Sequence, residues 1–185
     1  SYGEVYGQSA YYISSVSDEI YLHPQGILEL KGLAYQGMFF KNTLEKLEVE
    51  AQIIRHGKFK SAVEPFILEK MSKSNRKQVT RFLTSLWGDI TKGISEGREL
   101  NQKEINSMAQ NLLIQEADQA LEYNLVDKLA FKDELIDSLK SKLDLTNNQE
   151  INFVSLNEYK DVAVEGQNKK YSKNFIAKQA EIFIM

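Results

Sequence analysis

Apolar and polar residues follow regular spacings along most of the chain, and these spacings predict both strands and helices. Residues 19–23 and 26–32 have the pattern of short strands, the first ending at Pro24. Residues 49–54, "VEAQII", indicate a third, buried strand. Between the strands at 26–32 and 49–54, apolar residues within 37–47 recur at steps of three or four and indicate a helix. Strand, helix and strand in this order predict a right-handed βαβ unit on a parallel sheet.

A longer helical pattern begins at Ser74, and we expect an amphipathic helix of about 20 residues there. Ser72 or Ser74 can cap its start, and Gly97 is expected just after its end. Its apolar residues recur every three or four positions: Val79, Phe82, Leu83, Leu86, Trp87, Ile90 and Ile94. We expect this stripe to lie in the core, with a subunit interface as the alternative.

Other segments complete an α/β pattern of a parallel sheet with packed helices. Helices are predicted over 9–18, 101–110 (capped by Asn101), 116–130 and 131–143, and a strand over 151–159. After residue 160 the chain becomes polar and linker-like.

The composition is that of an ordinary globular domain and excludes several functions. The 185 residues are 42% hydrophobic and 26% charged, with a net charge of −3. Basic and acidic residues are interspersed, so no broad basic surface is expected and nucleic acid is excluded as a partner. Without cysteine, thiolate chemistry is impossible, and His23 and His56 lie in no metal-ligand motif. No cofactor or metal is therefore predicted, and no apolar run is long enough to span a bilayer. The chain lacks an initiator Met, so we expect a fragment or a processed product.

The most unusual position is Lys60, within "RHGKFKSAVEPF". It stands between the predicted strand 49–54 and the next element, close to the apolar residues Phe59, Ala62, Val63 and Phe66. A solvated loop lysine is the ordinary interpretation of such a residue, so its functional interpretation depends on the motifs around it.

Several segments together resemble the signal peptide peptidase (protease IV) family of the long, two-repeat type. They are "YGQSAYYISS", "LKGLAYQGMFFKNTLEKLEVE", "IIRHGKFKSAVEPF" and "ALEYNLVDKLA", and they cover about residues 1–160. The resemblance implies a Clp protease–crotonase-like repeat whose N-terminal part is missing here, followed by a linker or the start of a second repeat over 161–185. It also implies a serine peptidase with a Ser/Lys dyad that degrades cleaved signal peptides.

The same resemblance implies the setting of the complete protein. Its members are tethered to the bacterial inner membrane by an anchor outside this chain, and their catalytic domain is expected outside the cytoplasm. They assemble into dome-like homo-oligomers, so a tetramer-like assembly acting on peptide substrates is expected.

The resemblance gives Lys60 the role of general base, because it is the second lysine of the G-x-[FY]-K-S-A block. The nucleophilic serine belongs to a small-Ser-Gly-Gly-Tyr motif of the second repeat. In this chain the equivalent segment is "GQSAYYISS", and aligning Tyr11 and Tyr12 places Gln8 at the serine position. An amide cannot act as a nucleophile, and Ser9 is one position away. We therefore expect these 185 residues to supply the base, to lack the nucleophile and to be inactive alone.

A lysine accepts a proton near neutral pH only if its charged form is disfavoured. Its ordinary pKa is about 10.4, and burial among apolar groups lowers it. We expect the apolar neighbours of Lys60 to do this, although without the missing repeat the side chain can be exposed. Glu64 would oppose the shift if it lay close, so its carboxylate is expected to point away from Lys60, along a helix start or towards another lysine.

Two other interpretations stay open. The chain could be a non-catalytic repeat that scaffolds an oligomer, with Phe82, Leu86, Trp87 and Ile90 forming an interface. A crotonase-like acyl-CoA enzyme would share the fold, but the "KFKSAVEPF" block argues against it.

Overall fold

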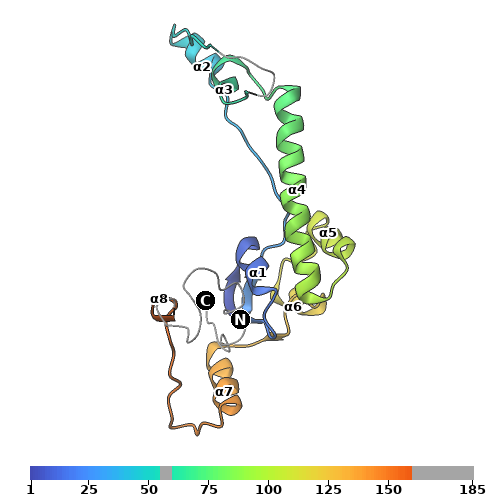
Figure 1. Cartoon of the computed structure of the whole chain (residues 1–185), viewed down its shortest axis with the longest axis vertical. Helices are drawn as coiled ribbons and strands as arrows, with labels where there is room; N and C mark the ends of the chain where they lie inside the picture. The colour runs from blue at the N-terminus through green and yellow to red at the C-terminus, as the bar shows by residue number, and fades with distance from the viewer. Residues whose placement is uncertain (55–59, 160–185) are drawn as a thin grey trace, which may run out of the picture. The chain divides into compact units, whose positions relative to one another are not determined.

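The computed structural model describes residues 1–54 and 60–159. Figure 1 shows the elements along the chain. In order they are β1 (Tyr2–Tyr6), α1 (Gln8–Ser14), β2 (Tyr21–Leu28), α2 (Lys41–Lys46), α3 (Glu64–Ile67), α4 (Lys73–Arg98), α5 (Gln102–Gln110), α6 (Ala117–Glu122), β3 (Lys128–Leu129), α7 (Lys132–Lys142) and α8 (Leu156–Tyr159). The chain divides into two compact units. The sheet unit comprises Ser1–Glu29 and the described residues from Ile114 onward, and the helical unit comprises Leu30–Leu113.

The sheet unit is built on three parallel strands in the order β1-β2-β3, which confirms the α/β class predicted from the sequence. β1, α1 and β2 form a βαβ unit near the start of the chain. The unit predicted from residues 26–54 is wrong, because residues 49–54 form no strand and Ile54 is completely exposed. A short apolar run does not by itself specify a partner strand, and this run has none among the described residues.

The two strands predicted around Pro24 are one strand, β2, so the expected break is also wrong. The pairing with β1 shifts there: Gly3 pairs with Leu22, but Val5 pairs with Ile27. The extra residues of β2 leave the regular ladder, and a proline without an N–H group is tolerated at such an irregularity.

Buried aromatic and aliphatic residues fill the space between the sheet and its helices. Tyr6, Tyr11 and Leu22 are at most 1% exposed. The hydroxyl of Tyr11 donates to the carbonyl of Leu125 at 2.7 Å. Asp127 lies in the same segment, and its carboxylate accepts the backbone N–H of Ile20 at 2.7 Å. The "ALEYNLVDKLA" block thus joins α6 and β3 to the centre of the sheet unit.

The last described part of the chain departs from the sequence prediction. Residues 151–155 are in no strand, and α8 follows at Leu156–Tyr159, so the strand predicted over 151–159 is wrong. Helix α7 was predicted correctly, and its Lys142 ammonium lies 2.6 Å from the Glu19 carboxylate. The predicted linker and second-repeat start at 161–185 lie outside the described residues.

In the helical unit, α4 is the longest element and confirms the long amphipathic helix. The Ser72 side chain accepts the N–H of Asn75, as expected for an N-cap. Gly97 lies inside the helix, whose last residue is Arg98 and whose C-cap, Glu99, is left-handed (φ 53°), so the predicted end was wrong. Helix α5 confirms its predicted cap, because the Asn101 side chain accepts the N–H of Lys103.

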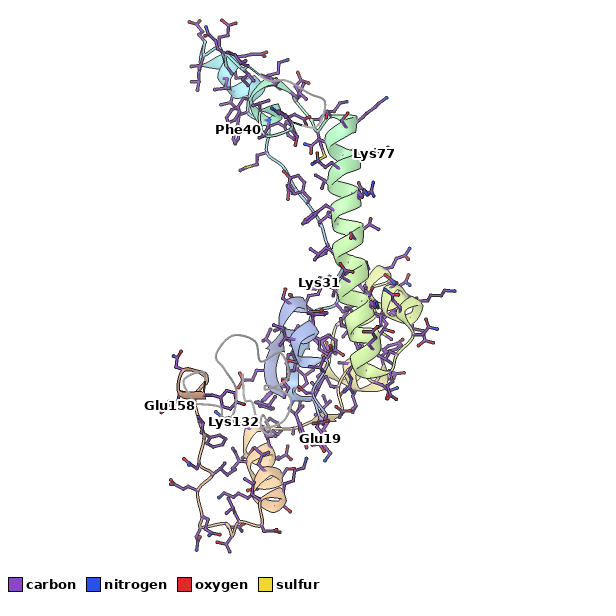
Figure 2. The ribbon with its side chains drawn as sticks, viewed as in Figure 1. Glu19, Lys31, Phe40, Lys77, Lys132 and Glu158 are labelled. Carbon is purple, nitrogen blue, oxygen red and sulfur yellow. The ribbon has the colours of Figure 1, made fainter. Side chains whose placement is uncertain are left out.

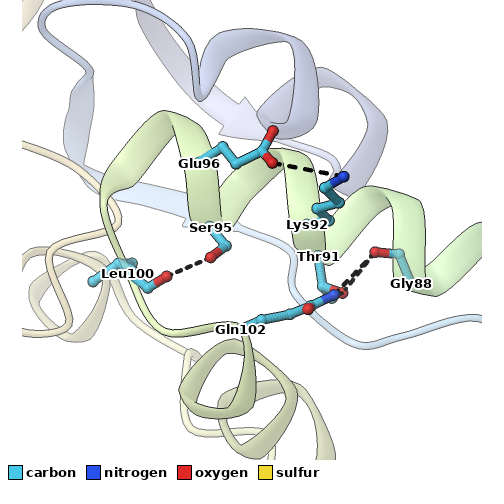
Figure 3. A network of polar contacts seen from close by, with 7 residues as sticks. All are labelled: Gly88, Thr91, Lys92, Ser95, Glu96, Leu100 and Gln102. Carbon is cyan, nitrogen blue, oxygen red and sulfur yellow. Dashed lines mark hydrogen bonds and ion pairs between the residues drawn. The ribbon is translucent and has the colours of Figure 1, made fainter.

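The two halves of α4 differ in how they are covered. At its C-terminal end a network of polar contacts joins α4 to the start of α5, as Figure 3 shows. The Gln102 amide donates to the Thr91 hydroxyl at 2.8 Å and to the Gly88 carbonyl at 3.0 Å. Ile94 is fully buried there, whereas Phe82 and Leu86 are 65% and 40% exposed. The expectation that the whole apolar stripe lies in the core is therefore wrong for the N-terminal half.

Candidate functional site

A groove of about 410 Å³ lies in the helical unit, directly beside the segment that carries Lys60. Its lining mixes apolar side chains with polar groups, among them Ser61 and, from α4, Asn75 and Gln78. The lining residues are Tyr35, Gly37, Met38, Phe39, Ser61, Ala62, Pro65, Met71, Asn75, Gln78, Val79 and Phe82. A mostly apolar depression with a few polar groups is the usual form of a ligand-binding site.

Helix α3 lines this groove through Pro65, and the segment just before α2 lines it through Gly37, Met38 and Phe39. The backbone N–H of Phe40 donates to the carbonyl of Pro65 at 2.6 Å, which joins the start of α2 to α3. The rings of Phe40 and Phe66 are stacked, with centroids 6.3 Å apart. Figure 2 shows Phe40 beside these helices and Lys77 on the first half of α4. No local pattern in the sequence predicts the contact between α2 and α3, because it joins residues about twenty-five positions apart.

Lys60 lies next to the groove, since it immediately precedes the lining residues Ser61 and Ala62. Its side chain is exposed. Of the neighbours expected to exclude water, Ala62 and Phe66 are themselves exposed, and Phe59 lies outside the described residues, as does His56. Among the described residues Lys60 is therefore not buried, and the neighbours expected to exclude water from it do not do so in this structure.

The carboxylate of Glu64 lies at the start of α4. Glu64 is only 1% exposed, and its side chain accepts hydrogen bonds from Ser72 and Asn75. These contacts agree with the expectation that this carboxylate lies along a helix start. The sequence pattern identified Ser72 as a cap, but it did not indicate that the Ser72 hydroxyl also donates a hydrogen bond to Glu64, eight residues earlier.

Gln8 and Ser9, the residues at and beside the expected nucleophile position, lie in the sheet unit. Gln8 is the first residue of α1, directly after the turn at Gly7 that ends β1. It is half-buried, and Ser9 is exposed. The structure thus places the Gln8 segment at a strand-to-helix turn, whereas Lys60 belongs to the helical unit.

Two further observations concern metals and membranes. Across residues 1–54 and 60–159, no three His, Asp or Glu side chains are grouped in a way that could hold a metal ion. Nor does any helix in the described part of the chain combine the length and apolar character needed to cross a bilayer.

Comparison with known proteins completes the description of the site. The model for the family described as Peptidase family S49 matches residues 1–146. A protein named Protease 4 from Salmonella typhi is 36% identical over 135 residues, covering 69% of this chain and 22% of the relative. Protease 4 from Haemophilus influenzae is 36% identical over 113 residues, covering 61% of this chain and 18% of the relative. A putative signal peptide peptidase SppA from Enterococcus faecium is 28% identical over 137 residues, covering 74% of this chain and 39% of the relative. The chain spans about a fifth of the length of the first two.

Proposed function

The chain belongs to peptidase family S49, and we propose that it supplies the general base, Lys60, to a serine peptidase that uses a Ser/Lys dyad. The observation that carries the proposal is the position of Lys60 in the "GKFKSAVEPF" block, directly beside the groove. A substrate held in the groove would lie beside the backbone of this residue in the proposal.

The chemistry requires a neutral amine beside a serine hydroxyl. A hydroxyl becomes an effective nucleophile only when a base accepts its proton during attack on the carbonyl. In this proposal the exposed Lys60 becomes such a base when a further segment of the complete protein covers it, because loss of water disfavours the charged ammonium form. The same covering segment would carry the serine.

The nucleophile lies outside these 185 residues in this proposal. Gln8 occupies the equivalent position, and its amide cannot form an acyl intermediate. The isolated chain is therefore expected not to hydrolyse peptides or small esters. Hydrolysis by the isolated chain that disappears in Lys60→Ala would refute this part of the proposal.

The proposed substrates are the remnants of cleaved signal peptides, which are apolar. The apolar side chains in the lining of the groove support this, as does the name of the Enterococcus relative. The complete protein is proposed to be a homo-oligomer tethered to the bacterial inner membrane by an anchor outside this chain, with the catalytic domain outside the cytoplasm.

A second candidate function is a non-catalytic repeat that scaffolds the oligomer. The exposure of Phe82 and Leu86 on one side of α4 favours it, because such residues are commonly covered by a partner. Activity measurements separate the two functions, since a scaffold does not need an amine at position 60.

The deciding experiment compares Lys60→Met with Lys70→Met in the complete protein that contains these residues. Lys70 is also an exposed lysine of the helical unit, so both variants remove one charge and leave a side chain of similar length. Loss of a general base is expected to lower kcat by about 10²- to 10⁴-fold, whereas Lys70→Met keeps full activity. Equal activities of the two variants would support the scaffold instead.

A further inference from the structure

Glu64 is a buried carboxylate, only 1% exposed, and several groups of the described residues donate hydrogen bonds to it. Its Oε1 atom accepts the Ser72 hydroxyl at 2.5 Å. Its Oε2 atom accepts the Ser72 backbone N–H at 3.1 Å and the Asn75 side-chain amide at 2.9 Å. A buried carboxylate is tolerated only with donors of this kind, so the arrangement fixes the position of the side chain.

The place of the carboxylate is favourable for a second reason. Ser72 is the N-cap of α4, where backbone N–H groups lack partners within the helix and the helix dipole attracts negative charge. The Ser72 hydroxyl donates to Glu64 while it accepts the Asn75 N–H at 3.1 Å. Glu64 and the cap therefore form one hydrogen-bonded cluster that connects α3 to α4.

The backbone of Glu64 extends this cluster to the neighbour of Lys60. Its N–H donates to the Ser61 carbonyl at 3.0 Å, which closes the turn between Ser61 and α3. Its carbonyl accepts the N–H of Leu68 at 2.8 Å, at the end of α3. A single residue thus holds the turn after Lys60, helix α3 and the first turn of α4, and Ser61 and Asn75 both line the groove.

We propose that Glu64 is a positioning residue for Lys60, acting through the Ser61–Glu64 turn that its side chain ties to the start of α4. This inference rests on the proposed role of Lys60 as general base. Glu64 contacts neither the substrate nor the reacting atoms in this account. It fixes the backbone that directly follows Lys60, and small displacements of a catalytic group are costly in rate.

Glu64→Gln in the complete protein tests the inference, with Glu69→Gln as the matched control. Glu64→Gln keeps the size of the side chain but replaces an oxygen that accepts hydrogen bonds by an NH₂ group facing Ser72 and Asn75. Glu69 undergoes the same chemical change at an exposed position, where its carboxylate lies 3.8 Å from Lys41. We expect kcat per folded molecule to fall by about 10- to 100-fold in Glu64→Gln, with KM within about twofold, and no change in Glu69→Gln.

A second variant covers the case in which Glu64→Gln does not fold. Asn75→Ala removes one of the donors to the carboxylate and leaves the Ser72 cap intact. The inference expects a smaller fall in kcat, about two- to fivefold; because Asn75 also lines the groove, kcat and not KM is the readout for this variant. Hydrogen exchange of the Ser61–Leu68 amides is expected to quicken in the same variants and to stay unchanged in Glu69→Gln.

The results distinguish failure of this inference from failure of the proposed function. If Lys60→Met abolishes activity while Glu64→Gln and Asn75→Ala retain kcat, Glu64 does not position the lysine. A loss of activity explained entirely by a smaller folded fraction would also overturn the inference. If Lys60→Met remains active, the proposed function itself is wrong, and exchange of the Ser61–Leu68 amides still reports whether Glu64 holds the turn.

Discussion

In the sheet unit Tyr11 is completely buried, whereas in the helical unit Met38 and Phe82 expose 71% and 65% of their surface. Both units carry apolar residues at regular spacing. Most of the fully buried ones lie in the sheet unit, although Val5, Ile13 and Val16 are exposed on its surface. In the helical unit apolar residues of α4 are buried where α5 covers its second half, whereas around the groove Met38 and Phe82 stay accessible. An apolar stripe therefore forms a core only where another element covers it.

The largest expected difference between the units is in the cost of losing an aromatic ring. Tyr11→Ala in the 185-residue chain removes a buried ring and the hydrogen bond to Leu125, and should destabilise the sheet unit by about 3–5 kcal/mol. Phe82→Ala at the exposed position should change stability by no more than about 0.5 kcal/mol. Urea unfolding followed by circular dichroism measures both, and similar losses would contradict the comparison.

Replacing a glycine by alanine should change stability by a smaller amount, and it should destabilise the sheet unit but stabilise the helical unit. A Cβ atom added at Gly26 would lie 2.6 Å from the Glu4 carbonyl oxygen and 2.8 Å from that of His23. Gly26→Ala should therefore destabilise the sheet unit by about 1–3 kcal/mol, the usual cost of overpacking.

Gly88→Ala is its counterpart in the helical unit. A Cβ atom at Gly88 meets no atom within 4 Å, and the residue lies inside α4. Alanine there should stabilise the helix by up to about 1 kcal/mol, because glycine loses more backbone entropy. Thermal unfolding of both variants checks the signs, and a destabilised Gly88→Ala would show that this part of α4 is more tightly enclosed than its contacts indicate.

The smallest expected effect is the pH dependence that one ion pair of the sheet unit, Glu19 and Lys142, contributes to stability. The Lys142 ammonium and the Tyr21 hydroxyl, which donates at 2.7 Å, lower the pKa of Glu19 from its ordinary value of 4.5. The same contact with Glu19 raises the pKa of Lys142 from 10.5. The depressed carboxylate stabilises the folded state above the ordinary pKa, and this stabilisation is lost as the pH falls through the folded value. The raised pKa of Lys142 means that its ammonium stabilises the folded state below pH 10.5. This stabilisation is lost as the pH rises through the pKa of Lys142 in the folded state.

Lys142→Met isolates this contribution. The pair is partly exposed, so its contribution at neutral pH should be below about 1 kcal/mol. The variant should lose that much stability at pH 7 and show a weaker loss between about pH 5 and pH 3. Denaturation measured across this range provides the check, and an unchanged pH profile would mean that the pair contributes nothing.

Local signals in the sequence predicted much of the secondary structure. Ser72 and Asn101 cap α4 and α5 as expected, because a cap depends on residues two or three positions away. The failures concern contacts between distant residues. Nothing within "VEAQII" indicates that it lacks a partner strand, and nothing near Pro24 shows that the irregular pairing with β1 accommodates it. The role of Lys60 came from a motif and stays a proposal, while the link between Glu64 and Ser72 required the fold.

By itself the sequence determined the α/β class, the family, most helix starts and the position of the candidate base. These depend on spacing, capping and motif, all of which act over a few residues. Only the tertiary structure decided which apolar residues are enclosed, that β2 continues through Pro24, and that a buried carboxylate ties the turn after Lys60 to α4. The physical reason is that burial and strand pairing depend on which distant segments meet, and local spacing does not specify those contacts.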